Sequence, residues 1–462
     1  MDTRLAQIVE KFIKKVAGNF SEEEIIKLDD LEIKLNENMN SFVVDFLAAY
    51  AEMIDEGIFE QKVERKEAGI IVHKRNVSRE YLSKFGLVKF NRRYYEFANQ
   101  YEYLTDRVVG LEAFERVSGN VAADLVDKAA NMSYQRSCIE AVGGKLSRQT
   151  TKNKIRKTKG LELMPTSCRK KVKILHVVAD EDHVAMQTGK RVIVPLITVH
   201  EGIAPVSKGR NRCINAKHFA SYGKKPRELW EEVSAWINAE YDFSYIERIY
   251  LHGDGAAWIK IGTEVLPECR FVLDKYHFQK WVTTVTGGPR KEYAWQIRKA
   301  LREYDIKEIK VIADEMLTEV SRKGEAETIQ SFWSYISNNW AGIEIRRDEP
   351  RCGGSCTEAQ ISHVLADRLS RGPMGWSEEG LKYMSRLRVF NVNGGKVTKE
   401  NFVRRDEEKE LSEMERRVIE KVKEIFGGVK DYSVFETLKY MQGKVTPINV
   451  LLKSINGSGF VF

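Results

Sequence analysis

The sequence predicts a mixed α/β fold that follows a mainly helical N-terminal region. Three observations lead to this prediction. Apolar residues recur at helical spacing over about the first 65 residues, and short apolar runs alternate with helical stretches after Pro165. Residues 278–345 then read as helix throughout, without a strand pattern. The chain of 462 residues has room for roughly two to four domains.

The N-terminal part divides into a helical region, residues 1–75, and a second region, residues 76–160. In the first region, apolar side chains recur three and four residues apart in two stretches that begin at Leu5 and Phe42. In the second region, residues 87–95 are rich in aromatic and apolar side chains around a polar turn, which predicts a β-ribbon.

Residues 121–159 are predicted to form a helix-turn-helix. Ser133 and Ser147 are expected N-caps, and two consecutive glycines supply the turn. The expected helices are 121–132, 134–142 and 148–157. Residues 141–161 hold seven Lys/Arg and no acid, which suits a helix in the major groove of DNA, although an ordinary solvated face remains the alternative. The expected DNA contacts are Arg148, Lys152, Lys154 and Arg156.

Residues 166–277 carry the α/β pattern. The expected strands are 173–179, 183–187, 191–199, 248–252 and 270–273, with a helix at 227–241. A Thr-Gly-Lys turn at 188–190 joins two of these runs, so the first three strands are expected to form an antiparallel ribbon. The later strands alternate with helices, which predicts a mixed α/β layer.

Three further regions follow. Residues 278–350 are expected to be an all-helical insertion, because the α/β pattern returns in residues 351–393 with a helix at 357–371. Residues 394–462 form a charge-dense C-terminal tail with one amphipathic helix around 411–425.

Composition indicates a globular protein rather than a disordered or membrane-spanning one. Apolar residues make up 42% of the chain, and no apolar run reaches the ~20 residues that a bilayer span needs. Lys+Arg is 75 against 67 Asp+Glu, a net charge of +8 that hints only weakly at a polyanionic partner. The N-terminus is charged and the six cysteines are sparse, so we expect a cytoplasmic protein with reduced thiols.

Three acidic residues, far apart in the chain, are the candidate catalytic and metal-binding residues. Asp180 is expected to end the first strand of the α/β region, Asp254 ends a later strand, and Glu358 lies in the first turn of a helix. Carboxylates that converge in this way suit Mg²⁺ or Mn²⁺. Two such ions, ~4 Å apart, can activate the attacking oxygen and stabilise the leaving oxygen of a phosphodiester.

Neighbouring acids compete with Asp180 for this assignment. Glu181 and Asp182 are rivals in the sequence, but Asp180 directly follows the apolar run. Because side chains alternate along a strand, Asp182 can share the face of Asp180 and serve as an auxiliary carboxylate. The sequence contains no phosphate-binding loop of the Gly-x-x-x-x-Gly-Lys-[Ser/Thr] type, so dependence on ATP is not expected.

Five strings in the chain resemble a known family. Taken together, the sequence is similar to the Lre-type insertion-sequence transposases, which are filed as an uncharacterised bacterial protein family and are related to the Mutator-like DDE transposases. The likeness runs from the β-ribbon to about Asn393. The strings are DEDHV at 180–184, GDGAAWI at 253–259, LDKYHF at 273–278, TEAQISHVL at 357–365 and RGPMGWS at 371–377.

The resemblance implies a ribonuclease H-like catalytic core with Asp180, Asp254 and Glu358 as its acids. It also implies an Asp-x-x-His signature, here Asp274 and His277, and a helical insertion before the catalytic glutamate. Asp274 and His277 are therefore expected as auxiliary residues near the metal ions, although an Asp N-cap followed by a packed His is an equally good interpretation.

The activity that the resemblance implies is metal-dependent DNA cleavage at the ends of an insertion sequence and strand transfer into target DNA. The partners would be the terminal inverted repeats and target DNA, and the protein would assemble as a dimer or larger oligomer on them. Two alternatives remain open. One is a ribonuclease H-like nuclease that cuts without joining, and the other is a domesticated DNA-binding protein.

Overall fold

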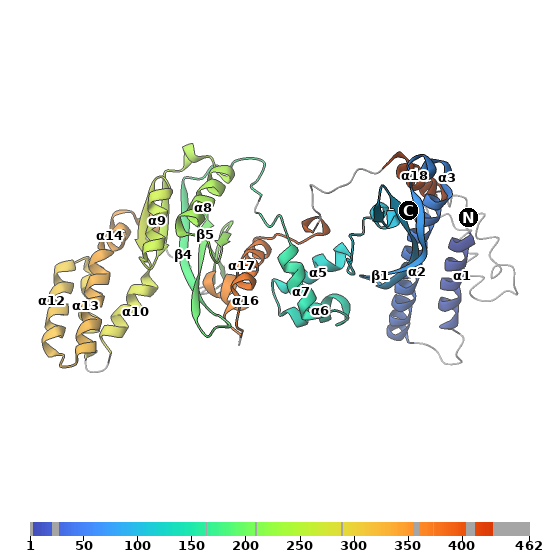
Figure 1. Ribbon diagram of the computed structural model, residues 1–462. Coiled ribbons are helices and arrows are strands. Elements are labelled where there is room, and N and C mark those ends of the chain that lie inside the picture. The colour runs from blue at the N-terminus through green and yellow to red at the C-terminus, as the bar shows by residue number, and fades with distance from the viewer. Residues whose placement is uncertain are drawn as a thin grey trace. The chain divides into compact units, whose positions relative to one another are not determined.

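The computed structural model describes most of the chain (Figure 1). The described residues are 3–20, 27–162, 164–207, 210–287, 290–353, 360–372, 374–402 and 412–427. The predicted catalytic residue Glu358 lies outside them, as do Thr357 and Leu411 of two predicted helices. Contacts divide the chain into two compact units. They are Met1–Leu125 with Ser137–Ser147 and Thr398–Phe462, and Val126–Arg136 with Arg148–Val397.

The first unit combines long helices with a three-stranded antiparallel sheet of order β1-β2-β3. Its helices are α1 (Thr3–Gly18), α2 (Leu28–Glu60), α3 (Lys62–Glu67), α4 (Leu104–Val108) and α18 (Glu413–Gly427). Its strands are β1 (Ile71–Ser83), β2 (Gly86–Phe97) and β3 (Gln100–Glu102). Residues 87–95, predicted as a ribbon around a polar turn, are strand as expected, but they belong to the single strand β2; its hairpin partner is β1, and the turn lies between Ser83 and Gly86.

A hydrophobic core joins the long helix α2, the sheet and α18 in this unit. Ile54 and Ile58 of α2 are fully buried with Tyr95 of β2 and Val418 of α18. A Cβ placed on Gly57 would lie 2.8 Å from Val418, so α18 packs directly on the glycine surface of α2. The predicted helical region, ribbon and amphipathic tail helix therefore share a core, although they are far apart in the sequence.

The predicted helix-turn-helix residues form three helices. They are α5 (Gly119–Ala129), α6 (Tyr134–Val142) and α7 (Arg148–Lys157). α6 and α7 have the predicted bounds, and Ser133 Oγ accepts a hydrogen bond from the N–H of Arg136 at 3.2 Å, as an N-cap does. The division between the two units passes through α5 and α6, and α7 belongs to the second unit.

The second unit is built on a five-stranded mixed sheet of order β10-β9-β4-β5-β8. Its strands are β4 (Ile174–Ala185), β5 (Arg191–His200), β8 (Lys217–Ala220), β9 (Arg248–Gly253) and β10 (Cys269–Leu273). β4, β9 and β10 are parallel neighbours, whereas β5 runs antiparallel to both β4 and β8. A separate hairpin pairs β6 (Ile203–Ser207) with β7 (Arg210–Cys213).

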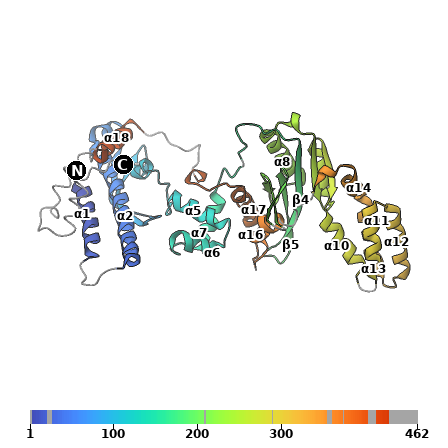
Figure 2. The same ribbon diagram turned by 180° about the vertical axis from the view of Figure 1, so that it is seen from behind.

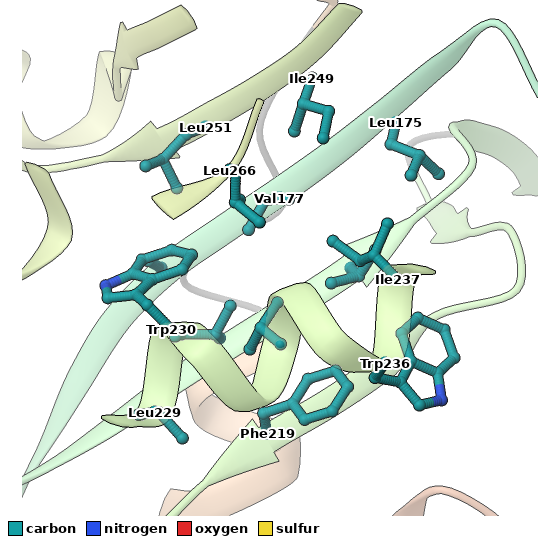
Figure 3. Close-up of a cluster of buried hydrophobic side chains, with 14 of the residues drawn as sticks. Leu175, Val177, Phe219, Leu229, Trp230, Trp236, Ile237, Ile249, Leu251 and Leu266 are labelled. Carbon is teal, nitrogen blue, oxygen red and sulfur yellow. The ribbon is translucent and has the colours of Figure 1, made fainter. Parts of the chain in front are cut away.

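Two helices cover one face of this sheet, α8 (Pro226–Glu240) and α9 (Ala257–Val265). Figure 3 shows Trp230 and Ile237 of α8 facing strand residues such as Val177 and Leu251. A Cβ on Gly262 would lie 2.8 Å from Leu251 and Trp230, so only glycine allows α9 to pack this closely.

The first strand of the sheet differs from the prediction. The sequence predicted that this strand ends at Asp180 and that another begins at His183. In the structure, β4 is continuous from Ile174 to Ala185. It pairs with β5 from His176 to Ala185, while its pairing with β9 ends at Val178. The apolar run stops at Ala179 although the strand continues. Beyond Val178, β4 has β5 as its partner but no longer pairs with β9.

The predicted insertion is helical in its described residues. It consists of α10 (Lys275–Val285), α11 (Tyr293–Glu303), α12 (Ile306–Glu319), α13 (Lys323–Asn338) and α14 (Trp340–Asp348). Figure 2 shows α11, α12 and α13 side by side as a small bundle. The bundle has its own core, which Leu273 at the end of β10 joins. The insertion is therefore anchored at the sheet edge that β10 forms.

The remaining described elements are short except for one helix. They are the 3₁₀ turns Phe243–Tyr245, Pro350–Cys352 and Lys399–Asn401, the π-helical turn Ile361–Ala366, α16 (Asp367–Leu369) and α17 (Glu378–Val392). The helix predicted at 357–371 is thus helical from residue 360 to 369 in its described part. Among the described helices, none is long and apolar enough to cross a membrane.

Candidate active site

The strand register places three aspartates next to each other on one face of the sheet. Val178 of β4 pairs with His252 of β9, which pairs with Val272 of β10. Two residues further along these parallel strands lie Asp180, Asp254 and Asp274. Because side chains alternate along a strand, all three point to the same side, at the carboxyl ends of β9 and β10.

One oxygen of each carboxylate is held by a nearby backbone N–H. Asp180 Oδ1 accepts from Glu181 at 2.8 Å, and Asp254 Oδ1 accepts from Ala256 at 2.8 Å. Asp274 Oδ1 accepts from the N–H of Tyr276 at 2.9 Å, which makes Asp274 the N-cap of α10. These bonds fix the direction of each carboxylate before any ligand binds.

His277 lies among these aspartates. Its Nε2 is 3.8 Å from Asp180 Oδ2, an ion-pair distance rather than a hydrogen bond. Burial alone lowers the pKa of His277, but Asp180 and the charges of Asp274 and Asp254 outweigh burial and raise it. The raised pKa favours the imidazolium form, which offsets part of the repulsion among the three carboxylates.

Neither rival of Asp180 shares its environment. Glu181 points to the opposite face, where its Oε2 accepts a hydrogen bond from Trp258 Nε1 at 2.8 Å. Asp182 shares the face of Asp180, is 6% exposed, and accepts a hydrogen bond from Ser370 Oγ at 2.8 Å. Burial raises the pKa of Asp182. An auxiliary role for Asp182 would therefore require ionising a buried carboxyl group, which is costly.

Buried histidines line the same face of the sheet behind the aspartates. The ring of His176 stacks on His200 at 5.2 Å and on His252 at 5.8 Å between centroids. Burial lowers the pKa of His176 to about 4 and that of His252 well below its usual value. His176 and His252 are therefore neutral near pH 7 and act as packing groups.

The structure does not place all the predicted ligands. It brings Asp180 and Asp254 to one edge together with Asp274 and His277, whereas Glu358 is outside the described residues. Within the part of the chain that the structure describes, no group of three His, Cys, Asp or Glu side chains is arranged to hold a metal ion. The described acids can thus supply only part of a ligand set.

Two residues near this site, Tyr335 and Asn339, were not predicted from the sequence. Tyr335 lies in the last turn of α13 in the helical insertion, and Asn339 directly follows that helix. The Asn339 side chain lies against Gly255, the residue after Asp254. No local motif could have identified either residue, because they lie 81 and 85 positions after Asp254 in the chain. The one sequence feature that reflects this contact is the second glycine of the Gly-Asp-Gly string, because a larger residue there would collide with Asn339.

The predicted DNA-contacting residues differ in exposure. Arg148 is exposed and Lys152 is half-buried, but Lys154 is 7% exposed. Arg156 is half-buried and forms an ion pair with Glu379 of α17. The prediction that Lys154 lies on an exposed basic face is therefore wrong, because α7 buries the side of the helix that carries Thr151, Lys154 and Ile155.

Two buried arginines, also missed, support the segment that follows Glu358. Arg388 of α17 donates to the carbonyl oxygens of Val364 and His363, both at 2.7 Å. Arg368 donates to the carbonyl of Ala129 at 2.8 Å, and burial lowers its pKa to about 10. Arginines read as surface residues in the sequence, so only the fold reveals these anchors.

Comparison with known proteins gives one consistent result. The family model described as "Uncharacterised protein family (UPF0236)" matches residues 21–406. A UPF0236 protein of Caldanaerobacter subterraneus subsp. tengcongensis is 34% identical over 97% of this chain and 98% of its own length. Another from the same organism, also 34% identical over 97% of this chain and 98% of its own length, carries eleven locus names. A UPF0236 protein in the vanSb 3′ region of Streptococcus gallolyticus is 25% identical over 79% and 83%.

Proposed function

We propose, from the premise that this chain belongs to the UPF0236 family of uncharacterised proteins, that it is a DDE-type transposase. It would cut DNA at the ends of an insertion sequence and join those ends to target DNA. Its substrates would be the terminal inverted repeats and target DNA, in the cytoplasm and without ATP. Two ends must be processed together, so the active form would be a dimer or a larger assembly.

The observation that carries this proposal is the line of Asp180, Asp254 and Asp274 across three neighbouring parallel strands, with His277 beside them. These residues belong to strings by which the chain resembles Mutator-like DDE transposases. Acids that are far apart in the sequence and meet at one sheet edge are typical of sites that act on phosphodiesters.

The sheet supports a ribonuclease H-like core. Numbered from β4, the order β10-β9-β4-β5-β8 is 5-4-1-2-3, and only the second strand, β5, is antiparallel to the others. The helices α8 and α9 cover one face. This arrangement agrees with the fold that the resemblance implies, including an all-helical insertion between β10 and the glutamate-bearing segment.

Each residue would have a separate task in this site. Asp180, Asp254 and Glu358 would hold Mg²⁺ or Mn²⁺, since hard divalent cations prefer carboxylate oxygens. When bound, a pair of these ions would activate the attacking oxygen and stabilise the leaving oxygen of the phosphodiester. Asp274 caps α10 and so positions His277, which orients the Asp180 carboxylate and carries a proton at the edge of the site.

The comparisons support a mobile element. One relative carries eleven locus names in a single organism, and another relative carries four in the same organism. A gene that copies itself leaves such repeated loci, whereas a housekeeping nuclease does not need them. For this chain, the exposed side of α7, with Arg148 and the half-buried Lys152, is the proposed contact with element ends.

The proposal is tested with Asp254→Asn in the full chain. We expect Mg²⁺-dependent cleavage of end DNA to be lost while binding to that DNA is kept, because the amide preserves size but removes the ligand charge. The matched control is Asp314→Asn, an exposed aspartate of α12 that pairs with Lys310, which should cleave normally. Unchanged cleavage by Asp254→Asn would disprove the site assignment.

A strand-transfer assay separates the proposal from a nuclease that only cuts. Pre-cleaved ends with a free 3′-hydroxyl are incubated with target plasmid and Mg²⁺. A transposase gives joined product, and a nuclease gives none. If the protein binds end DNA but neither cuts nor joins it, the domesticated DNA-binding protein becomes the better account.

A further inference from the structure

The helical insertion places a buried polar side chain next to the acidic sheet edge. Asn339, the residue that directly follows α13, is 6% exposed. Its carboxamide lies against Gly255, where an added Cβ would be 2.4 Å from Oδ1, 2.8 Å from Cγ and 2.9 Å from Nδ2. Gly255 has a φ of +89° and directly follows Asp254. Glycine is therefore required here both for the turn and for the room that Asn339 occupies.

The orientation of the Asn339 amide follows from one hydrogen bond. Its Nδ2 donates to the backbone carbonyl of Tyr335 at 2.8 Å, an arrangement that the reversed amide would turn into oxygen facing oxygen. Oδ1 is the other end of the amide, is buried, and accepts no hydrogen bond from any described residue. A buried acceptor without a partner is destabilising, so a ligand that satisfies it gains binding free energy.

The surrounding groups limit what can satisfy Oδ1. Carboxylates such as Asp254 only accept hydrogen bonds when ionised, so they cannot pair with an amide oxygen. The Tyr335 hydroxyl, one helical turn before Asn339, is also buried and without a partner among the described residues. Burial raises the pKa of Tyr335, and the charges of Asp254 and Asp274 raise it further, which places this side chain within their field. A divalent cation held by Asp254, or one of its waters, suits this position because the same carboxylates act on Tyr335.

We propose that Asn339 Oδ1 is a neutral oxygen ligand of the divalent cation held by Asp254, directly or through one of its waters. Hard cations accept amide carbonyl oxygens alongside carboxylates. The inference rests on the proposed function, since it adds a ligand to the same site. It also gives the helical insertion a role in the site, because α13 delivers a side chain that the sheet itself lacks.

The test is a calorimetric titration of the full-length protein with Mn²⁺ in the absence of DNA, so that its readout is affinity rather than activity. Asn339→Ala is expected to weaken Mn²⁺ binding about tenfold, at the lower end of the effect of removing a group that supports a metal site. The matched control is Asn338→Ala, an exposed neighbour on the same helix, which should bind as the wild type does. Thermal melting without metal reports whether each variant is folded.

A second variant decides the question should Asn339→Ala fail to fold. Asn339→Asp keeps the size of the side chain but loses the hydrogen bond to the Tyr335 carbonyl; the added ligand charge should outweigh that loss, so it should bind Mn²⁺ more tightly than the wild type. Wild-type affinity in both Asn339 variants would overturn the inference while leaving the proposed function intact, provided Asp254→Asn weakens binding. Failure of the wild type to bind Mn²⁺, or normal binding by Asp254→Asn, would overturn the proposed function and the inference with it.

Discussion

His277 Nε2 lies 3.8 Å from Asp180 Oδ2, although the two residues are 97 positions apart in the chain and belong to different elements. Asp180 is on β4 and His277 is in the first turn of α10, which follows β10. Strand β9, which ends at Asp254, lies between β4 and β10. The contact between His277 and Asp180 therefore links α10, at the start of the insertion, to the first strand of the sheet.

The first prediction concerns this link. His277→Gln removes the imidazole beside Asp180 and should lower the rate of end cleavage about 10–100-fold, the range found for groups that support metal ligands. End-DNA binding, measured by gel shift, should stay unchanged. The control is His183→Gln, because His183 is on the same strand as Asp180 but is 60% exposed. Equal loss in both variants would contradict a specific role for His277.

The second prediction concerns the turn after Asp254. Gly255→Ala should destabilise the protein by about 1–3 kcal/mol through backbone strain, with a further cost because the new Cβ collides with the Asn339 amide. Gly189→Ala is the matched control, because Gly189 has a φ of +79° but no atom within 4 Å of an added Cβ. Chemical denaturation should therefore show a larger loss for Gly255→Ala. Equal losses would mean that Asn339 moves aside at no cost.

The third prediction concerns the buried arginine of α17. Arg388→Met keeps much of the side-chain volume but leaves the carbonyls of His363 and Val364 without their donor, so the free energy of unfolding should fall by about 2–4 kcal/mol. Arg386→Met, at an exposed position of the same helix, should change it by less than about 0.5 kcal/mol. Urea denaturation compares the two. Similar values for both would argue against an anchoring role.

The fourth prediction concerns acid stability. Glu240 accepts a hydrogen bond from the Thr166 N–H at 2.7 Å and pairs with Lys170 at 2.9 Å. Burial alone raises the pKa of Glu240, but Thr166 and Lys170 outweigh burial and lower it. A lowered folded-state pKa gives stability that is present above the unfolded pKa of about 4.3 and is lost as the pH falls.

Wild-type protein should therefore lose free energy of unfolding more steeply than Glu240→Gln between about pH 5 and pH 3. Glu231→Gln, at an exposed position of the same helix, should follow the wild-type curve. Denaturation at several pH values measures this. Parallel curves for wild type and Glu240→Gln would contradict the role given to Thr166 and Lys170.

The fifth prediction separates exposed from buried basic residues of α7. Arg148→Ala should weaken end-DNA binding and reduce the slope of log affinity against log salt by about 1, as the loss of one phosphate contact does. Lys154→Ala should instead lower the melting temperature, because Lys154 is buried. Lys307→Ala, exposed on α12, is the control for a general loss of positive charge. A normal salt slope for Arg148→Ala would remove α7 from the DNA interface.

Local sequence patterns predicted many individual elements well. The bounds of α6 and α7 agree with the prediction, and those of α8 lie within one residue of it, because periodic apolar residues, Ser N-caps and Pro226 act within one turn of the chain. The strand at 183–187 was predicted separately because Asp180, Glu181 and Asp182 interrupt the apolar run. Pairing with β5 keeps these acids in one strand, and no local pattern reports pairing.

The sequence by itself determined the mixed α/β class, the helical insertion and the choice of Asp180 and Asp254, since each of these follows from neighbouring residues. Only the tertiary structure decided that Asp274 lies in register with them and that Asn339 is placed against Gly255. The reason is physical. Propensity and periodicity act over a few residues, whereas strand register and the approach of α13 depend on packing between segments tens of residues apart.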